Sequence, residues 1–219
     1  MLSLYETLRL NNEGAALYNA NEPTRAAEKL HTSLLGARSL IQHRYATAHQ
    51  AVRCYPNTSS PLEYCGKDRN GFFLYLRAMI FKEPVSTEKS MIAPSPVYFA
   101  GILFNLAILH HQHWTRVGSS VVLNKATVFY QAVLEILQGA GDLRNDSTAV
   151  LLAFVANNNL AQIELEMGDV HSFNQRLQYI HQFFYSSHTD FRNTLSESEI
   201  KGLLSNVLAA GSVNTAPVA

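Results

Sequence analysis

Three copies of a short pattern, Asn followed two positions later by a small residue, precede paired amphipathic segments in this chain. The copies are Asn12-Glu13-Gly14, Asn105-Leu106-Ala107 and Asn159-Leu160-Ala161. Each copy lies within an apolar pattern of helical period, and each is followed by a second amphipathic segment. This order predicts repeated helical hairpins, an architecture that buries its apolar faces by stacking neighbouring units.

Punctuating residues set the limits of the predicted helices. Pro23 suits the opening turn of a second helix, where a missing N–H costs least, and Ser95-Pro96 has the same form. Asp146 is a predicted N-cap, and Gly168 a helix-ending turn. Ser196 and Glu199 form a capping box for a final helix. We expect helices over residues 4–20, 23–52, 97–114, 122–137, 147–167, 172–185 and 200–209.

Residues 53–94 interrupt the repeats. Clustered Pro, Gly and Asn residues between positions 56 and 71 predict a loop, which leads into the apolar run FFLYLRAMIF at residues 72–81. We predict an extended segment laid on the helices, with a short helix as the alternative, because periodicity does not assign so short a run. The segment either fills the gap between the first two hairpins as core or lies across a groove as a built-in ligand or gate.

The second helices of the three hairpins share a spacing. In each, three positions are separated by four and then three residues, and in the middle copy the set lies seven residues further from the small residue of the opening pattern. Small side chains at a helix crossing let the backbones approach, and larger ones fill the space beside them. The predicted packing residues are Gly14, Leu17, Ala26, Leu30, Ala107, Ala126, Tyr130, Ala161, Phe173 and Leu177.

This spacing resembles the tetratricopeptide repeat, a helix-turn-helix unit of roughly 34 residues. The resemblance covers residues 4–52 and 97–185 and implies an all-α fold, with three antiparallel hairpins stacked as a short solenoid. Leu10, Glu13 and Phe173 depart from the family pattern, as does the long insertion. The expected single domain, residues 1–219, comprises repeat 1 (about 4–52), the insertion (about 53–94), repeat 2 (about 97–138), repeat 3 (about 146–187) and a capping helix (about 196–210).

The resemblance also implies a function, which is to bind a peptide or helix of a partner protein. First helices of the family line a concave groove, and an Asn amide there can both donate to and accept from a peptide backbone. The alternative is that these Asn residues tie neighbouring hairpins together. Family members that grip a C-terminal carboxylate use Lys and Arg beside such Asn residues, which this groove lacks, so we expect a neutral or apolar ligand. The implied groove residues are Asn11, Asn12, Ala15, Tyr18, Asn19, Phe104, Asn105, Ile108, His111, Gln112, Asn158, Asn159, Gln162 and Glu166.

Composition and motifs argue against several other functions. Seventeen Lys and Arg residues balance seventeen Asp and Glu residues, which disfavours nucleic acid and membrane surfaces as partners. The apolar stretches fall short of the roughly 20 residues of a membrane span, and the N-terminus lacks a secretory pattern. We therefore expect a cytoplasmic protein, with the nucleus left open. Motifs for nucleophilic catalysis or phosphate binding are missing, so we expect no enzyme activity and no cofactor.

A histidine cluster suggests an alternative to peptide binding, namely a helical metal-binding protein or enzyme. His110 and His113 are three residues apart and can share a helix face, as metal ligands or as groups in catalysis. A carboxylate or Cys at ligand spacing is missing. We therefore interpret these residues as helix-end histidines, favoured by the C-terminal dipole, and predict no metal site.

Overall fold

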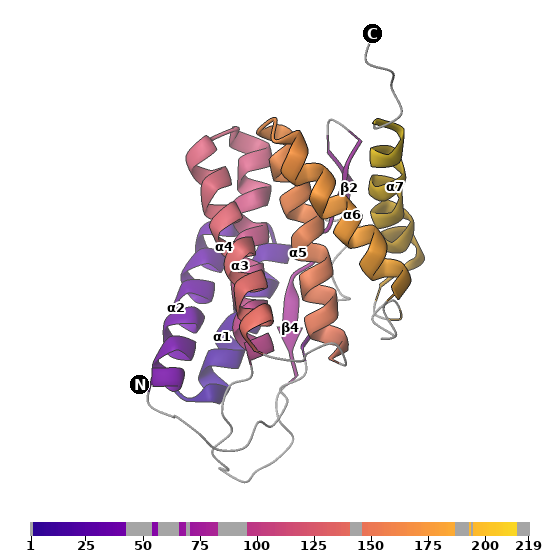
Figure 1. Ribbon diagram of the computed structural model, residues 1–219. Helices are drawn as coiled ribbons and strands as arrows, with labels where there is room; N and C mark the ends of the chain where they lie inside the picture. The colour runs from indigo at the N-terminus through magenta and orange to yellow at the C-terminus, as the bar shows by residue number, and fades with distance from the viewer. Residues whose placement is uncertain are drawn as a thin grey trace. The chain divides into compact units, whose positions relative to one another are not determined.

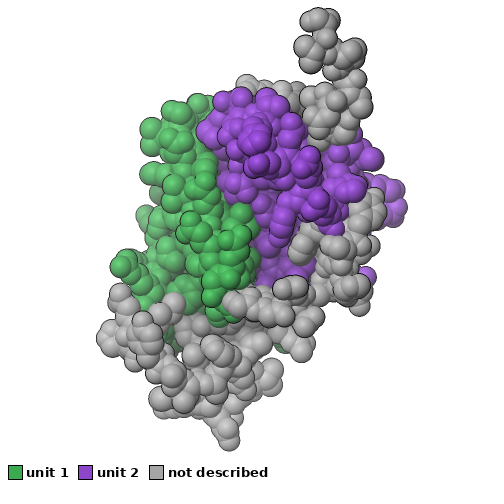
Figure 2. All heavy atoms as spheres, in the orientation of Figure 1, with its two compact units in different colours: residues 1–60, 77–141 green, residues 61–76, 142–219 purple. Residues whose placement is uncertain are grey.

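The computed structural model describes residues 2–42, 54–56, 66–68, 71–82, 96–140, 146–186, 193 and 195–213. Within these residues the protein is helical, with seven helices that pack mostly as adjacent antiparallel pairs. The chain divides into two compact units, coloured separately in Figure 2. Unit 1 contains residues 1–60 and 77–141, and unit 2 contains residues 61–76 and 142–219.

Unit 1 contains two helix pairs and a short β ribbon. Helix α1 packs against α2, and α3 packs against α4 (Figure 1). The α1 N-terminus carries a capping box, in which Ser3 N–H donates to Glu6 Oε2 (2.7 Å) and Glu6 N–H donates to Ser3 Oγ (3.2 Å). The elements are α1 (Leu4–Asn19), α2 (Pro23–Gln42), β1 (Cys54–Pro56), β4 (Met79–Phe81), α3 (Pro96–Val117) and α4 (Ser120–Gly139).

Gly14, one of the predicted small residues, lies where the two helices of a pair meet. A Cβ atom on Gly14 would lie 2.7 Å from Leu30 Cγ and 3.3 Å from the carbonyl oxygen of Ala26, so α1 and α2 approach closely at this point. In the second pair the rings of Phe104 and Tyr130 lie 5.8 Å apart. All ten predicted packing residues are buried except Leu17, which is half-buried.

Unit 2 contains the remaining three helices and a second ribbon. The Asp146 carboxylate caps α5, accepting from the N–H groups of Thr148 (2.9 Å) and Ala149 (3.0 Å). Gly168, at φ 77°, turns the chain into α6. Helix α6 packs against α5 and α7, and α7 also contacts β3. The elements are β2 (Gly66–Lys67), β3 (Phe73–Leu74), α5 (Ser147–Glu166), α6 (Val170–Ser186) and α7 (Glu197–Val213).

The helix predictions are confirmed over the described residues. Helices α3, α4, α6 and α7 extend beyond their predicted ends, and the capping box of Ser196 and Glu199 is present at the start of α7. Residues 43–52 and the predicted N-cap Ser95 lie outside the described residues, as does most of the insertion. The solenoid stacking of the hairpins and the single domain stay predictions.

Residues 72–81, which we call the central segment, are extended rather than helical, as predicted. In unit 2 its strand β3 pairs antiparallel with β2, and Leu74 lies opposite Gly66. In unit 1 its strand β4 pairs antiparallel with β1, and Ile80 lies opposite Tyr55. All side chains of the segment are buried except Ile80, which is half-buried. Each unit therefore builds part of its core from the segment.

The contact between α7 and the segment generates a stability prediction. A Cβ atom on Gly202 would lie 2.2 Å from Cδ2 of Phe73, closer than packed atoms allow. We expect Gly202→Ala to lower the free energy of unfolding by about 1–3 kcal/mol, measured by chemical denaturation. Gly139→Ala is the matched control, since a Cβ there meets nothing within 4 Å and alanine favours a helix. Equal stability of the two variants would contradict this packing.

Candidate functional site

Asparagine side chains of unit 1 hold strand β4 by its backbone. The Met79 N–H donates to Asn105 Oδ1 (2.7 Å), and Asn105 Nδ2 donates back to the Met79 carbonyl (2.8 Å). Asn12 pairs with Phe81 in the same way, with both distances 2.8 Å. Each of these side chains thus satisfies the donor and the acceptor of one residue.

Asn11 links the two helices that carry these side chains. Its Nδ2 donates to the Met79 carbonyl (3.2 Å), and its Oδ1 accepts from Asn105 Nδ2 (2.9 Å). Asn11 is completely buried and Asn105 is 1% exposed, so these hydrogen bonds lie away from water. We call Asn11, Asn12 and Asn105 clamp 1.

Unit 2 holds strand β3 and the residue after it with a second set, Asn158, Asn159 and Asn206, which we call clamp 2. Phe73 N–H donates to Asn206 Oδ1 (2.7 Å), and Asn206 Nδ2 donates to the Phe73 carbonyl (2.9 Å). Asn159 pairs with Tyr75 through bonds of 3.0 and 2.7 Å. Asn158 Nδ2 donates to the Phe73 carbonyl (3.0 Å), and its Oδ1 accepts from Asn206 Nδ2 (2.7 Å).

The clamps take the place of a third strand in each ribbon. Along a strand, the N–H and C=O groups of alternate residues point to the same edge. The asparagines bond the backbone groups of Met79, Phe81, Phe73 and Tyr75. The alternating residues Ile80 and Leu74 therefore present their backbone groups to the edge of the partner strand. An unpaired buried peptide group is costly, and the amides of the clamps satisfy those of the four residues that they bond.

A turn at the start of the segment extends the site in unit 2. Asp68 Oδ1 accepts from Phe72 N–H (2.8 Å), and Asp68 N–H donates to the Phe72 carbonyl (2.8 Å). Gln162 Nε2 donates to the other carboxylate oxygen of Asp68 (3.0 Å) and to Glu166 (3.3 Å). The predicted groove residues Gln162 and Glu166 therefore act on this turn, Glu166 through Gln162.

Aromatic side chains of the central segment pack against aromatic rings and a glycine of the helices. The Phe81 ring lies edge-on to Tyr98 of α3, with centroids 4.7 Å apart. In unit 2 the Phe72 ring lies 6.0 Å from that of Phe173, and Phe73 lies against Gly202. Backbone recognition by the clamps is thus combined with side-chain fit.

Other predicted groove residues take different places. Phe104 and His111 contact Tyr130 of α4, with His111 Nδ1 3.3 Å from the Tyr130 hydroxyl oxygen. These contacts make them part of the α3–α4 packing, a role that the resemblance did not imply. The remaining five lie outside both clamps: Ala15, Tyr18 and Ile108 are buried, and Asn19 and Gln112 are half-buried.

The two histidines of the cluster, His110 and His113, lie in different environments. His110 stacks on Phe129 of α4, with ring centroids 5.6 Å apart, whereas His113 is exposed. Burial, with smaller contributions from Lys125, His31 and His113, lowers the pKa of His110 from 6.5 to about 4. Among the described residues, no group of three or more His, Cys, Asp or Glu side chains is placed to hold a metal ion.

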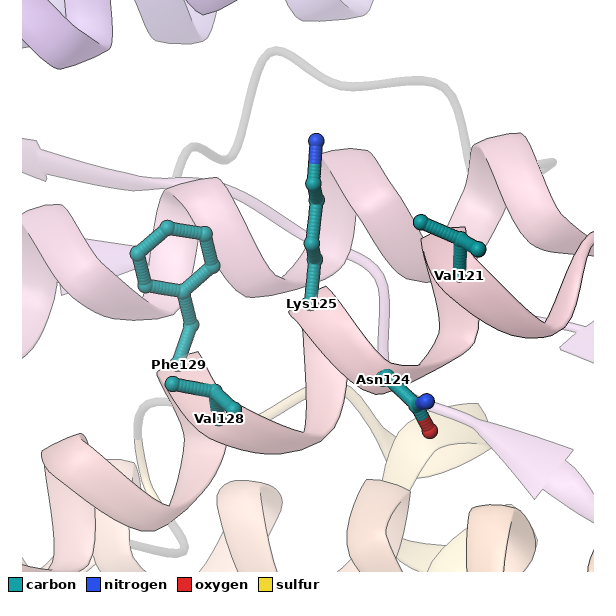
Figure 3. A pocket seen from close by; sticks show the side chains of 5 residues that line it. All are labelled: Val121, Asn124, Lys125, Val128 and Phe129. Atoms are coloured by element: carbon teal, nitrogen blue, oxygen red, sulfur yellow. The ribbon is translucent and has the colours of Figure 1, made fainter.

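Helix α4 presents apolar side chains on its outer surface. A hollow of about 330 Å³ is lined by Val121, Asn124, Lys125, Val128 and Phe129, and Figure 3 shows Lys125 and Phe129 on the same side of the helix. Among the described helices, α4 is long and apolar enough to span a membrane, a test of length and composition that core helices of soluble proteins also pass. The predicted lack of a membrane partner stays a prediction.

No family model, curated protein or solved structure matches the chain. The two clamps can, however, be compared with each other. Every hydrogen bond described for clamp 1 has a counterpart in clamp 2, when Asn11, Asn12 and Asn105 are matched to Asn158, Asn159 and Asn206. The bond between the adjacent asparagines is also repeated, at 3.4 Å in clamp 1 and 3.2 Å in clamp 2. One geometry is therefore used twice.

Asn206 is the clamp residue that the sequence did not predict. The small residue that follows Asn in the other copies is replaced here by Leu208, so the opening pattern misses it. A different signal was present, because residues 202–207 read GLLSNV and residues 101–106 read GILFNL. Helix α7, predicted as a cap, thus also contributes to the site.

Removal of one clamp amide should destabilise the segment. We expect Asn105→Ala to lower the free energy of unfolding by about 3 kcal/mol, because both backbone groups of Met79 lose a buried partner. Hydrogen exchange of the Met79 amide should accelerate accordingly. The control Asn124→Ala removes an exposed Asn from α4 and should change stability by less than about 0.5 kcal/mol. Unchanged Met79 exchange in Asn105→Ala would contradict the clamp.

The lowered pKa of His110 predicts a pH dependence of stability. Between pH 6.5 and about 4 the unfolded chain binds a proton at this position and the folded chain does not. Stability is therefore lost as the pH falls through this window. We expect His110→Gln to reduce the fall in Tm between pH 6.5 and 4, whereas His113→Gln, which removes an exposed histidine, preserves it. The same pH profile in both variants would refute this assignment.

Proposed function

We propose that this protein is a divergent tetratricopeptide-like interaction module whose first helices, together with α7, hold an extended peptide by its backbone. The observation that carries the proposal is that one clamp geometry accepts two different sequences. Clamp 1 holds Met79-Ile80-Phe81, and clamp 2 holds Phe73-Leu74-Tyr75. A site that recognises backbone groups in this way suits peptides of varied sequence.

The chemistry of the clamps defines the ligand class. Their amides are uncharged and buried, except that of the half-buried Asn12, so a charged side chain placed against them would lose its hydration without an ionic partner. The first and third residues of each held tripeptide are aromatic or apolar. The residue between them, Ile80 or Leu74, is also apolar. We infer that the partner peptide is extended, neutral and apolar or aromatic at alternate positions.

The central segment is then the resident ligand of the site. Its burial makes an empty site costly, because apolar surface and the clamp amides would meet water together. A partner peptide binds by replacing the segment and reproducing its backbone bonds. This mode unites the two interpretations of the segment, since it is core when resident and a gate when displaced.

A complementation experiment tests the proposal. Residues 68–82 are replaced by a Gly-Ser linker of equal length, and a synthetic peptide of residues 68–82 is added in trans. We expect the variant alone to lose its cooperative thermal transition, and the peptide to restore it at a 1:1 ratio, measured by circular dichroism and calorimetry. The restoration follows from the same hydrogen bonds made between two chains.

The matched control is the same peptide with N-methyl groups on Tyr75 and Met79. It keeps every side chain but cannot donate to Asn159 and Asn105, so we expect it not to restore the transition. Equal restoration by both peptides would remove the backbone clamp from the explanation. A variant that neither folds nor recovers with peptide, even after joint refolding, would make the segment constitutive core and end the proposal.

A further inference from the structure

Helix α4 is apolar in sequence but only partly buried. Only 28% of its apolar stretch is buried, although such a helix is usually covered on all sides. On the face turned away from α3, Val121 and Val128 are 64% and 61% exposed. Apolar groups that gather on one exposed face mark an interaction site. The face that packs against α3 is formed by Leu123, Ala126, Tyr130, Val133 and Leu137.

The outer face of α4 carries one regular stripe of residues. Its positions are separated by alternating steps of four and three residues, which is the spacing of the seam between two packed helices. Because successive residues are rotated by about 100°, the stripe lies opposite the face that packs on α3. The hollow described above lies along its first half (Figure 3). The members, which we call the α4 stripe, are Val121, Lys125, Val128, Ala132, Glu135 and Gly139, all exposed except the half-buried Ala132.

The two charged residues of the α4 stripe have no opposite charge on their own helix within reach. Lys125 and Glu135 are the only charged residues of α4, and they lie ten positions apart, about 15 Å along a helix axis. In the described part of the chain, neither side chain takes part in an ion pair. Both are therefore available to a partner.

The α4 stripe is complementary to itself when two copies run antiparallel. With the two helices level at residue 130, each pair joins opposite charges or a larger side chain with a smaller one. A Cβ atom on Gly139 would meet nothing within 4 Å, so the space beside it is open to a valine of the partner. A surface that matches itself in this way is what a two-fold dimer requires. The pairs are Lys125 with Glu135, Val128 with Ala132, and Val121 with Gly139.

The charges also select the direction of the two helices. In a parallel pair, Lys125 would lie beside Lys125 and Glu135 beside Glu135, and like charges placed together across an interface are destabilising. Only the antiparallel pair brings each cation to a carboxylate. The charge pattern therefore argues for a second copy of this chain as the occupant.

We propose that two copies of this protein associate through the α4 stripe, antiparallel and related by a two-fold axis near residue 130. Lys125 of each copy pairs with Glu135 of the other, and the valines cover the small residues between them. Because a single helix pair buries a small area, the association is weak and depends on concentration. This inference does not depend on the proposed function of the clamps.

Sedimentation velocity of the full-length protein, over a range of micromolar concentrations, tests the proposal. We expect the wild type to pass from monomer to dimer as the concentration rises. Lys125→Glu and Glu135→Lys each turn both ion pairs into like-charge pairs, so each should raise the dissociation constant at least about tenfold. The control Lys201→Glu makes the same change of net charge at an exposed position of α7 and should leave the dissociation constant unchanged.

Two combinations separate charge pairing from a loss of folding. The double variant Lys125→Glu/Glu135→Lys restores opposite charges in both pairs and should dimerise like the wild type. An equimolar mixture of the two single variants should form a mixed dimer, because every pair in it again joins opposite charges. A parallel dimer would gain nothing from the double exchange. Circular dichroism confirms that each variant is folded before sedimentation.

Three outcomes would overturn the proposal. The first is a wild type that stays monomeric over the whole concentration range. The second is a dimer whose dissociation constant neither single variant changes, since its interface would then lie on another surface. The third is binding of a monomeric wild type to phosphatidylcholine vesicles that Val128→Glu abolishes, because the outer face of α4 would then meet a lipid surface.

Discussion

Both units depend on hydrogen bonds between an asparagine amide and a backbone peptide group, two groups of similar chemistry. Each carries one carbonyl and N–H donors at similar spacing, so one side chain can pair with both backbone groups of a strand residue. In each unit two asparagines do this, and a third joins the helices that carry them. An apolar segment can thereby enter a helical core without leaving its peptide groups unsatisfied.

The recurring Asn-x-small pattern has a geometrical reason. Successive helix residues are rotated by about 100°, so two positions place side chains about 200° apart, on nearly opposite faces. Asn12 therefore reaches Phe81 while Gly14 lies against Leu30 of α2. One face of the helix holds the segment and the other packs against its partner helix.

Helix α7 shows how far this logic extends beyond the pattern. It holds Phe73 as α3 holds Met79, although its residue two positions after the asparagine is the large and exposed Leu208. The clamp face is thus kept where the packing face is changed. A helix can therefore contribute to the site although its other face departs from the pattern.

The sequence by itself determined the helices, their pairing and the extended character of residues 72–81, because capping residues, apolar periodicity and close-packed small residues act over short distances. It also singled out five of the six clamp asparagines. Only the tertiary structure decided what they hold, since a segment far away in the chain fills the site. It also turned Phe104 and His111 toward Tyr130 and brought Asn206 to Phe73. Such contacts depend on which helices become neighbours, which local periodicity does not encode.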